Sequence, residues 1–103
     1  MAHYKRGLAR AERRDAHGAL REYTSAIELA DTPDEVKAMA LYNRALVLAA
    51  NGENLKAVAD LRAVLAMQAP PQNVKKEAKR RLERMQRQID VNSASRPNRR
   101  GAN

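Results

Sequence analysis

The chain has 103 residues, enough for one domain of ordinary size and too few for two. It contains no cysteine, phenylalanine or tryptophan, which excludes disulfides and thiolate metal sites, and no apolar run approaches the ~20 residues of a membrane span. The net charge is +8, and Met1 to Arg14 lack the apolar core of a signal peptide, so we expect a soluble protein of the cytoplasm.

The first two predicted elements are helices. Good helix formers dominate the sequence and no run alternates apolar and polar residues as a strand does, so we expect an all-α fold. The first helix is predicted over about residues 2–14, with Tyr4, Leu8 and Ala11 as its apolar stripe. The second follows a cap at Asp15 and runs to about residue 30, with apolar residues every three or four positions: Ala19, Leu20, Tyr23, Ala26 and Ile27.

A third helix is predicted over about residues 33–50. Thr32 before it is a good N-cap, Pro33 suits the first helical position, and Glu35 completes a capping box. The helix has apolar residues on more than one side, so we expect it to be buried on more than one side. The Asn51–Gly52 pair ends it, because both residues tolerate the left-handed conformation of a helix C-cap.

The last two helices are predicted over about residues 54–68 and 73–90, separated by a proline pair. The fifth helix has one narrow apolar stripe on an otherwise polar and mostly basic surface: Val74, Ala78, Leu82, Met85 and Ile89. Residues 71–103 carry ten basic and three acidic side chains, so +7 of the net charge lies there. Residues 92–103 have no large apolar side chain and are predicted to form a disordered basic tail.

Two stretches of the chain repeat at an offset of 38 residues. Each stretch has, in chain order, two small residues, one large apolar residue and a third small residue. The pairs are Gly7 with Ala45, Ala19 with Ala57, Tyr23 with Leu61, and Ala26 with Val64. A constant offset over about 25 positions indicates a true internal repeat.

These residues resemble those of the tetratricopeptide repeat family, whose helix pairs cross closely at small residues. The resemblance implies a stack of antiparallel helix pairs in one domain over residues 1–91. Its repeats would cover about residues 2–30 and 36–68, and the fifth helix would be a capping helix with a polar outer face. The first helix departs from the family pattern, since His3, Arg6 and Arg10 stand where large apolar residues are usual.

The resemblance also implies a binding site, because the first helices of such repeats line a concave groove that holds an extended peptide. Carried over by position, the groove residues are Tyr4, Leu8, Ala11, Met39, Tyr42, Asn43, Leu46, Ala50, Lys76, Lys79, Arg80 and Glu83. Asn43, Lys76 and Arg80 resemble part of a set that holds a peptide carboxylate in some members, which suggests a preference for acidic peptides. Met39 and Leu46 have an equally good alternative as core residues.

Nothing in the sequence favours an enzyme. It has no glycine-rich phosphate loop, paired-carboxylate motif or nucleophile motif, and no cofactor or metal is expected. His3 and His17 have no acidic partner at a metal-binding spacing along a helix, so both are predicted to be solvated side chains.

We therefore expect a non-enzymatic scaffold or adaptor whose groove binds a peptide or helix of another protein. Alternatively, a second copy of the chain fills the groove and forms a homodimer. The other class is a nucleic-acid accessory protein that binds phosphates through a basic surface of the fifth helix, comprising Lys75, Lys79, Arg81, Arg84 and Arg87, and the tail. The C-terminal third has no aromatic residue for base stacking, and a solvated capping face explains its charge more simply.

Overall fold

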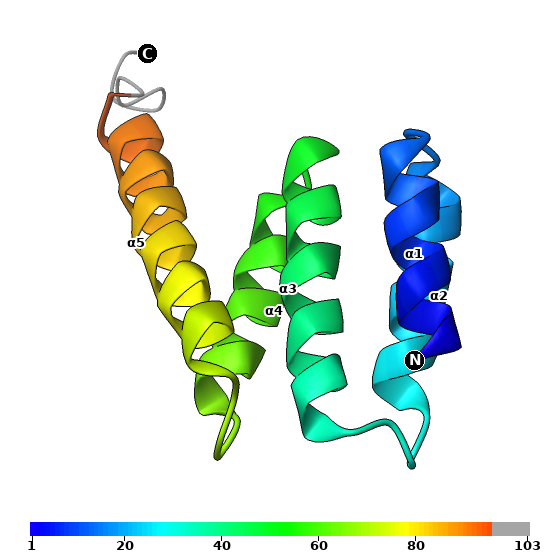
Figure 1. The fold of residues 1–103 in the computed structure, drawn as a ribbon. Helices are drawn as coiled ribbons and strands as arrows, with labels where there is room; N and C mark the ends of the chain where they lie inside the picture. The colour runs from blue at the N-terminus through cyan, green and yellow to red at the C-terminus, as the bar shows by residue number, and fades with distance from the viewer. Residues whose placement is uncertain (96–103) are drawn as a thin grey trace.

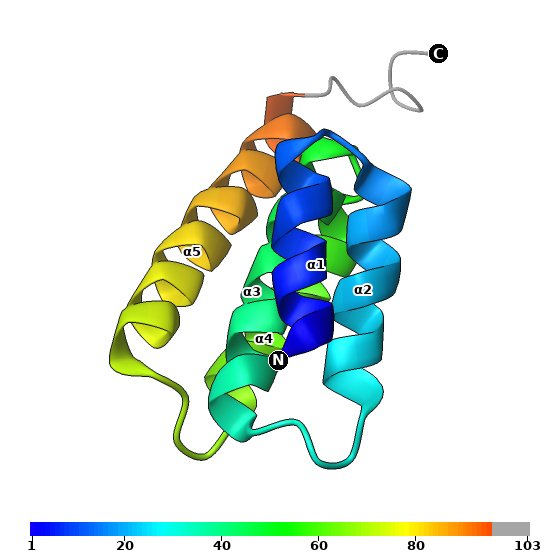
Figure 2. The same cartoon turned by 45° about the vertical axis from the view of Figure 1, so that its right-hand side comes forward.

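The computed structural model describes residues 1–95, which form five helices and no strand (Figure 1). The all-α prediction is confirmed. Successive helices run in opposite directions, so the first four form two hairpins and the fifth lies beside the second hairpin (Figures 1 and 2). The helices are α1 (Ala2–Glu12), α2 (Ala16–Glu28), α3 (Asp34–Ala50), α4 (Asn54–Ala66) and α5 (Gln72–Ser95).

α3 is buried on two sides, as its sequence predicts. Val36 and Ala40 belong to a core cluster with residues of α1 and α2, including Tyr4 and Tyr23. Its other side belongs to a second cluster with α4 and α5, through Ala38, Leu41, Ala45 and Leu48. The helix therefore joins the first hairpin to the rest of the molecule.

The two helices of each hairpin cross at small residues, and residues 38 positions apart are buried alike. Ala19 and Ala57 are both completely buried, and Tyr23 and Leu61 are both 1% exposed. At the first crossing a Cβ atom on Gly7 would lie 2.5 Å from Cε1 of Tyr23, so any larger residue requires the Tyr23 ring or the helices to shift. The repeat in the sequence is thus matched by a repeat in the packing.

Two helix boundaries show which local signals the chain uses. Asp15 caps α2 as predicted, its Oδ1 accepting a hydrogen bond of 2.9 Å from the Gly18 amide. The prediction for Thr32 is wrong: Pro33 is the N-cap residue of α3, without a side-chain cap bond, and Thr32 is buried. Pro33 has the non-helical ψ of 147° that an N-cap residue adopts, so the helix begins at Asp34, one residue later than the capping box requires.

The C-terminal boundary also differs from the prediction. α5 continues to Ser95, so residues 92–95, which we expected in a disordered tail, are helical. A helix needs no large apolar residue to continue, and the first helix breaker after Pro71 is Pro97. The Gln88 amide also donates to Asn92 Oδ1 at 3.2 Å, one turn along. The rest of the predicted tail, residues 96–103, lies outside the described residues.

Each hairpin also contains an arginine–carboxylate pair between its two helices, at positions that the repeat relates. Arg6 Nε lies 3.2 Å from Glu22 Oε2, and Arg44 Nε lies 2.8 Å from Asp60 Oδ2. Both partners of the second pair are 38 residues after those of the first. Arg6, which interrupts the apolar pattern of the first helix, is therefore one member of a repeated ion pair.

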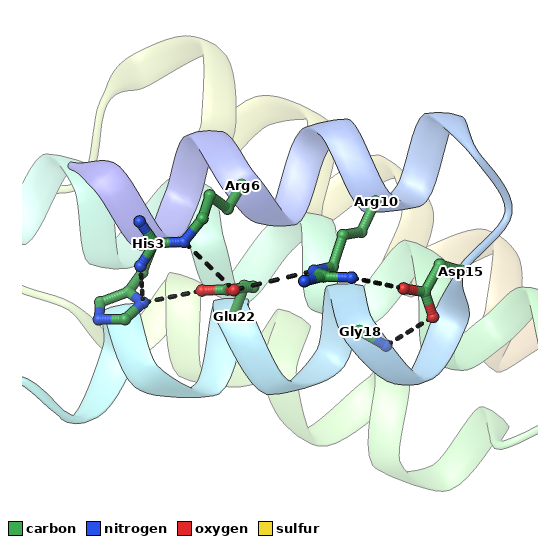
Figure 3. A network of polar contacts seen from close by, with 6 residues as sticks. All are labelled: His3, Arg6, Arg10, Asp15, Gly18 and Glu22. Atoms are coloured by element: carbon green, nitrogen blue, oxygen red, sulfur yellow. Dashed lines mark hydrogen bonds and ion pairs between the residues drawn. The ribbon is translucent and has the colours of Figure 1, made fainter.

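Around Glu22 this pair widens into a polar network that joins α1 to α2 (Figure 3). His3 Nδ1 lies 2.8 Å from both Glu22 Oε1 and an Arg6 nitrogen, and can donate to the first or accept from the second. The prediction that His3 is merely solvated is wrong, because the apolar positions of this helix are replaced by side chains that pair with Glu22. His17 is exposed, as predicted.

The network gives a prediction for acid stability. The hydrogen bond with His3, followed by that with Arg6, lowers the pKa of Glu22 below its ordinary value of 4.5. A lowered folded-state pKa stabilises the fold above that ordinary value, and the stabilisation is lost as the pH falls through the folded-state pKa. Glu22→Gln should therefore lower Tm at pH 7, and the difference from wild type should shrink steadily below pH 4.5. A Tm difference that does not change with pH would show that the charge of Glu22 contributes nothing.

Candidate functional site

The clearest candidate site is an apolar groove between α1 and α3. Two adjoining hollows, of about 410 and 450 Å³, share Ala11, Leu46 and Val47 in their walls. The first also contacts Arg14, Ala16, Ala50 and Asn51, and the second also contacts Leu8, Glu12, Tyr23 and Asn43. We call this combined hollow the α1–α3 groove. It has an apolar floor with a few polar side chains at its edges, which is the composition of a site that binds apolar side chains.

The structure separates the two residues that the sequence left undecided. Met39 packs against both core clusters and is a core residue. Leu46 is half-buried, belongs to neither cluster, and lines both hollows of the α1–α3 groove. A leucine that contributes to no core and faces a groove is available to a ligand.

Tyr4 and Asn43 join α1 to α3 at one end of the groove. The Asn43 amide donates to the Tyr4 hydroxyl at 3.2 Å and to the Met39 carbonyl at 2.8 Å. Burial raises the pKa of Tyr4, although the bond from Asn43 acts in the opposite direction. Both residues were predicted as groove residues, but Tyr4 is buried and the donors of Asn43 are used within the fold.

The same kind of contact recurs 38 residues later. Arg81 Nε of α5 donates to the Tyr42 hydroxyl of α3 at 3.3 Å, as Asn43 of α3 does to Tyr4 of α1. The buried residues agree, because Val74 and Ala78 of α5 correspond to Val36 and Ala40 of α3. α5 therefore continues the 38-residue register. Comparing it directly with α3 in the sequence would have revealed this.

This register places the predicted basic residues differently. Lys76 and Lys79 correspond to Ala38 and Leu41, the face that α3 turns to the second cluster, and they line a hollow made only of α5 residues. Arg80 pairs with Glu77 on its own helix at 3.2 Å. Within residues 1–95, no hydrogen bond or ion pair joins Asn43 to Lys76 or Arg80. The α5 side chain that donates to α3 is that of Arg81, one residue after the predicted Arg80.

The predicted basic surface divides accordingly. Arg81 is half-buried and held by Tyr42, whereas the other members, Lys75, Lys79, Arg84 and Arg87, are exposed. Five of the residues predicted for a groove line the two hollows of the α1–α3 groove: Leu8, Ala11, Asn43, Leu46 and Ala50. The sequence prediction did not include Val47 or Ala16.

No family model, curated protein or solved structure matches this chain. Its chemistry must therefore be taken from its own residues. Among residues 1–95, no three histidine or acidic side chains lie together as a metal ion requires, and no helix could span a membrane. What the α1–α3 groove can supply is apolar burial, worth about 1.5–3 kcal/mol for a fully enclosed leucine-sized side chain.

Proposed function

We propose that this chain is a non-enzymatic protein-interaction module that holds a peptide or helix of another protein in the α1–α3 groove. The observation that carries the proposal is Leu46, which lines the groove without belonging to either core cluster. A large apolar side chain kept half-exposed beside other apolar side chains marks a contact surface.

We further propose that the helices form a tetratricopeptide-like stack of two pairs and a capping helix. Three observations support this: close crossings at small residues, equal burial at an offset of 38, and continuation of the register into α5. The face of α5 that would meet a following helix is polar. There Lys76, Lys79 and Glu83 replace the buried Ala38, Leu41 and Ala45.

A second candidate is binding of nucleic acid through α5. It is favoured by the hollow that Lys75, Lys76 and Lys79 line together, since none of these exposed lysines has an ion-pair partner within residues 1–95. Contacts with phosphates alone are strongly salt-dependent and sequence-blind. Absence of RNA and DNA binding at about 50 mM salt would therefore exclude this function.

The groove is tested by selecting ligands for the folded chain from a displayed library of random peptides. We expect selected peptides to be rich in large apolar residues, and Leu46→Glu to weaken their binding on the order of tenfold or more, because it places a charge in the apolar floor. Leu55→Glu is the matched control: Leu55 is 78% exposed on α4, outside the groove, and its replacement should leave binding unchanged.

Two outcomes would contradict the proposal. One is that selected peptides bind both leucine variants as well as wild type. The other is a sedimentation mass of two chains that Leu46→Glu reduces to one, which would show that the groove is filled by a second copy.

A further inference from the structure

The α1–α3 groove contains a hydroxyl group for which the fold supplies no partner. Tyr23 is 1% exposed and lines the larger hollow, of about 450 Å³. Within residues 1–95 its hydroxyl forms no hydrogen bond, and no side-chain nitrogen or oxygen there is both fully buried and unpaired. The small exposed part of Tyr23 therefore includes the hydroxyl, which is available to a group that enters the hollow.

Gly7 explains how a side chain of α2 reaches a groove between α1 and α3. A Cβ atom at position 7 would lie 2.5 Å from Cε1 and 3.1 Å from Cζ of Tyr23, so the ring lies directly against the backbone of α1. Cζ is the atom that carries the hydroxyl. The second hairpin has Ala45 and Leu61 at the corresponding positions. The hydroxyl is therefore a feature of the first hairpin and not of the repeat.

The surroundings of Tyr23 keep this hydroxyl a donor. Burial, and to a smaller extent the neighbouring Tyr4, raises the pKa of Tyr23 to about 12. The phenol is therefore protonated at any ordinary pH, and it can donate one hydrogen bond. Leaving such a donor unpaired in a site that a ligand closes off from water is costly, so the ligand must supply an acceptor.

Asn43 contributes an acceptor to the same hollow. Its Nδ2 donates to the Tyr4 hydroxyl at 3.2 Å and to the Met39 carbonyl at 2.8 Å. Because a carbonyl accepts and never donates, the second bond fixes which atom of the Asn43 amide is the nitrogen. Its Oδ1 forms no hydrogen bond within residues 1–95. The hollow thus offers a ligand one donor, on Tyr23, and one acceptor, on Asn43.

We propose that this hollow binds a neutral amide group of the occupant, whose carbonyl accepts from Tyr23 and whose N–H donates to Asn43. The inference rests on the proposed function. An amide carries the matching acceptor and donor, whereas a carboxylate has no donor for Asn43 and would meet Glu12 in the same wall. The amide belongs to the backbone of an extended segment or to a glutamine or asparagine side chain of a helix, because a helix uses its own backbone amides internally.

Two sets of synthetic peptides distinguish these two sources of the amide. The first is a short peptide of alternating alanine and leucine with blocked ends, too short to form a helix, and analogues in which each internal amide in turn is replaced by an ester. The second is a long helical peptide with leucines at every third or fourth position and either glutamine or the similarly shaped methionine between them. Their dissociation constants for the full chain are measured by NMR titration, which detects weak binding.

Tyr23→Phe removes the hydroxyl and keeps the ring. It should weaken binding of the short peptide or of the glutamine helix about fivefold, to the level of the matching ester or methionine analogue. Loss with the short peptide assigns the amide to a backbone, and loss with the glutamine helix assigns it to a side chain. Tyr42→Phe is the matched control: Tyr42 lies outside both hollows and accepts from Arg81, so binding should not change.

Thermal unfolding supplies a readout that a structural role of the hydroxyl would not reproduce. Tyr23→Phe should leave Tm unchanged or raise it, because the fold loses no hydrogen bond. Tyr4→Phe should lower Tm, because the Asn43 amide then loses an acceptor. An equal loss of Tm in both variants would show that the Tyr23 hydroxyl is bonded within the fold, and the inference would be wrong.

The design separates this inference from the function on which it rests. Peptide binding that Leu46→Glu abolishes and Tyr23→Phe leaves unchanged would keep the groove and overturn the amide site. Failure of every peptide to bind would overturn both.

Discussion

Replacing Arg44 by alanine is expected to destabilise the fold by about 3 kcal/mol, because it leaves a buried carboxylate without its partner. Asp60 is 7% exposed, and Arg44 binds both of its oxygens at 2.8 Å. A third bond of 3.0 Å joins Arg44 to Thr24 of α2, so the same side chain holds three helices. The bond to Asp60 also raises the pKa of Arg44, which therefore stays charged at any ordinary pH. Urea unfolding followed by circular dichroism measures the loss.

The repeat supplies a matched control for this prediction. Arg6 holds the corresponding position in the first hairpin, but its side chain is 51% exposed, against 23% for Arg44. Arg6→Ala should therefore cost much less. The double variant Arg44→Met/Asp60→Leu should recover most of the stability lost in Arg44→Ala, because it removes the buried charge as well as its partner. Equal losses in Arg44→Ala and Arg6→Ala would show that burial does not determine the strength of this pair.

The sequence predicted the helices well because their signals are local. Asp15 caps α2 through the residue three positions on, and the period of apolar residues in the third helix revealed both of its buried sides. Errors arose where a local rule had an equally good alternative one residue away. Pro33 is suited both to the N-cap and to the first helical position. Which of the two it occupies depends on the course of the connection from α2 to α3, in which Thr32 is buried.

The candidate site was less predictable because it depends on register between distant helices. A shift of one residue in α5 exchanges Arg80 for Arg81 as the partner of α3. The signal that fixes this register is Pro71, 38 residues after Pro33, and it becomes evident only when α5 is aligned directly with α3. Burial cannot be read from residue type either. Leu46 and Leu48 lie two positions apart on the same helix, yet Leu48 is 7% exposed in the core while Leu46 faces the groove.

The second large effect is expected at Gly7, where replacement by alanine should destabilise the fold by about 1–2 kcal/mol. Glycine in the middle of a helix is usually improved by alanine, by roughly 0.5–1 kcal/mol. Here the added Cβ would lie 2.5 Å from Cε1 and 2.6 Å from Cδ1 of the buried Tyr23 ring. Overpacking of this kind costs about 1–3 kcal/mol and outweighs the gain in helix propensity. The sign of the change in unfolding free energy is therefore the result to measure.

The repeat also indicates how the loss can be reversed. The second hairpin has Ala45 where the first has Gly7, and Leu61 where the first has Tyr23, and both of its residues are 1% exposed. The pairs Gly7–Tyr23 and Ala45–Leu61 are thus two combinations of side chains that fill the equivalent helix crossing. Gly7→Ala in a Tyr23→Leu background should cost less than in wild type, with a coupling of about 1 kcal/mol in the double-mutant cycle. Additive effects would mean that α1 moves away from α2 to admit the methyl group, and that the crossing is not set by contact between residues 7 and 23.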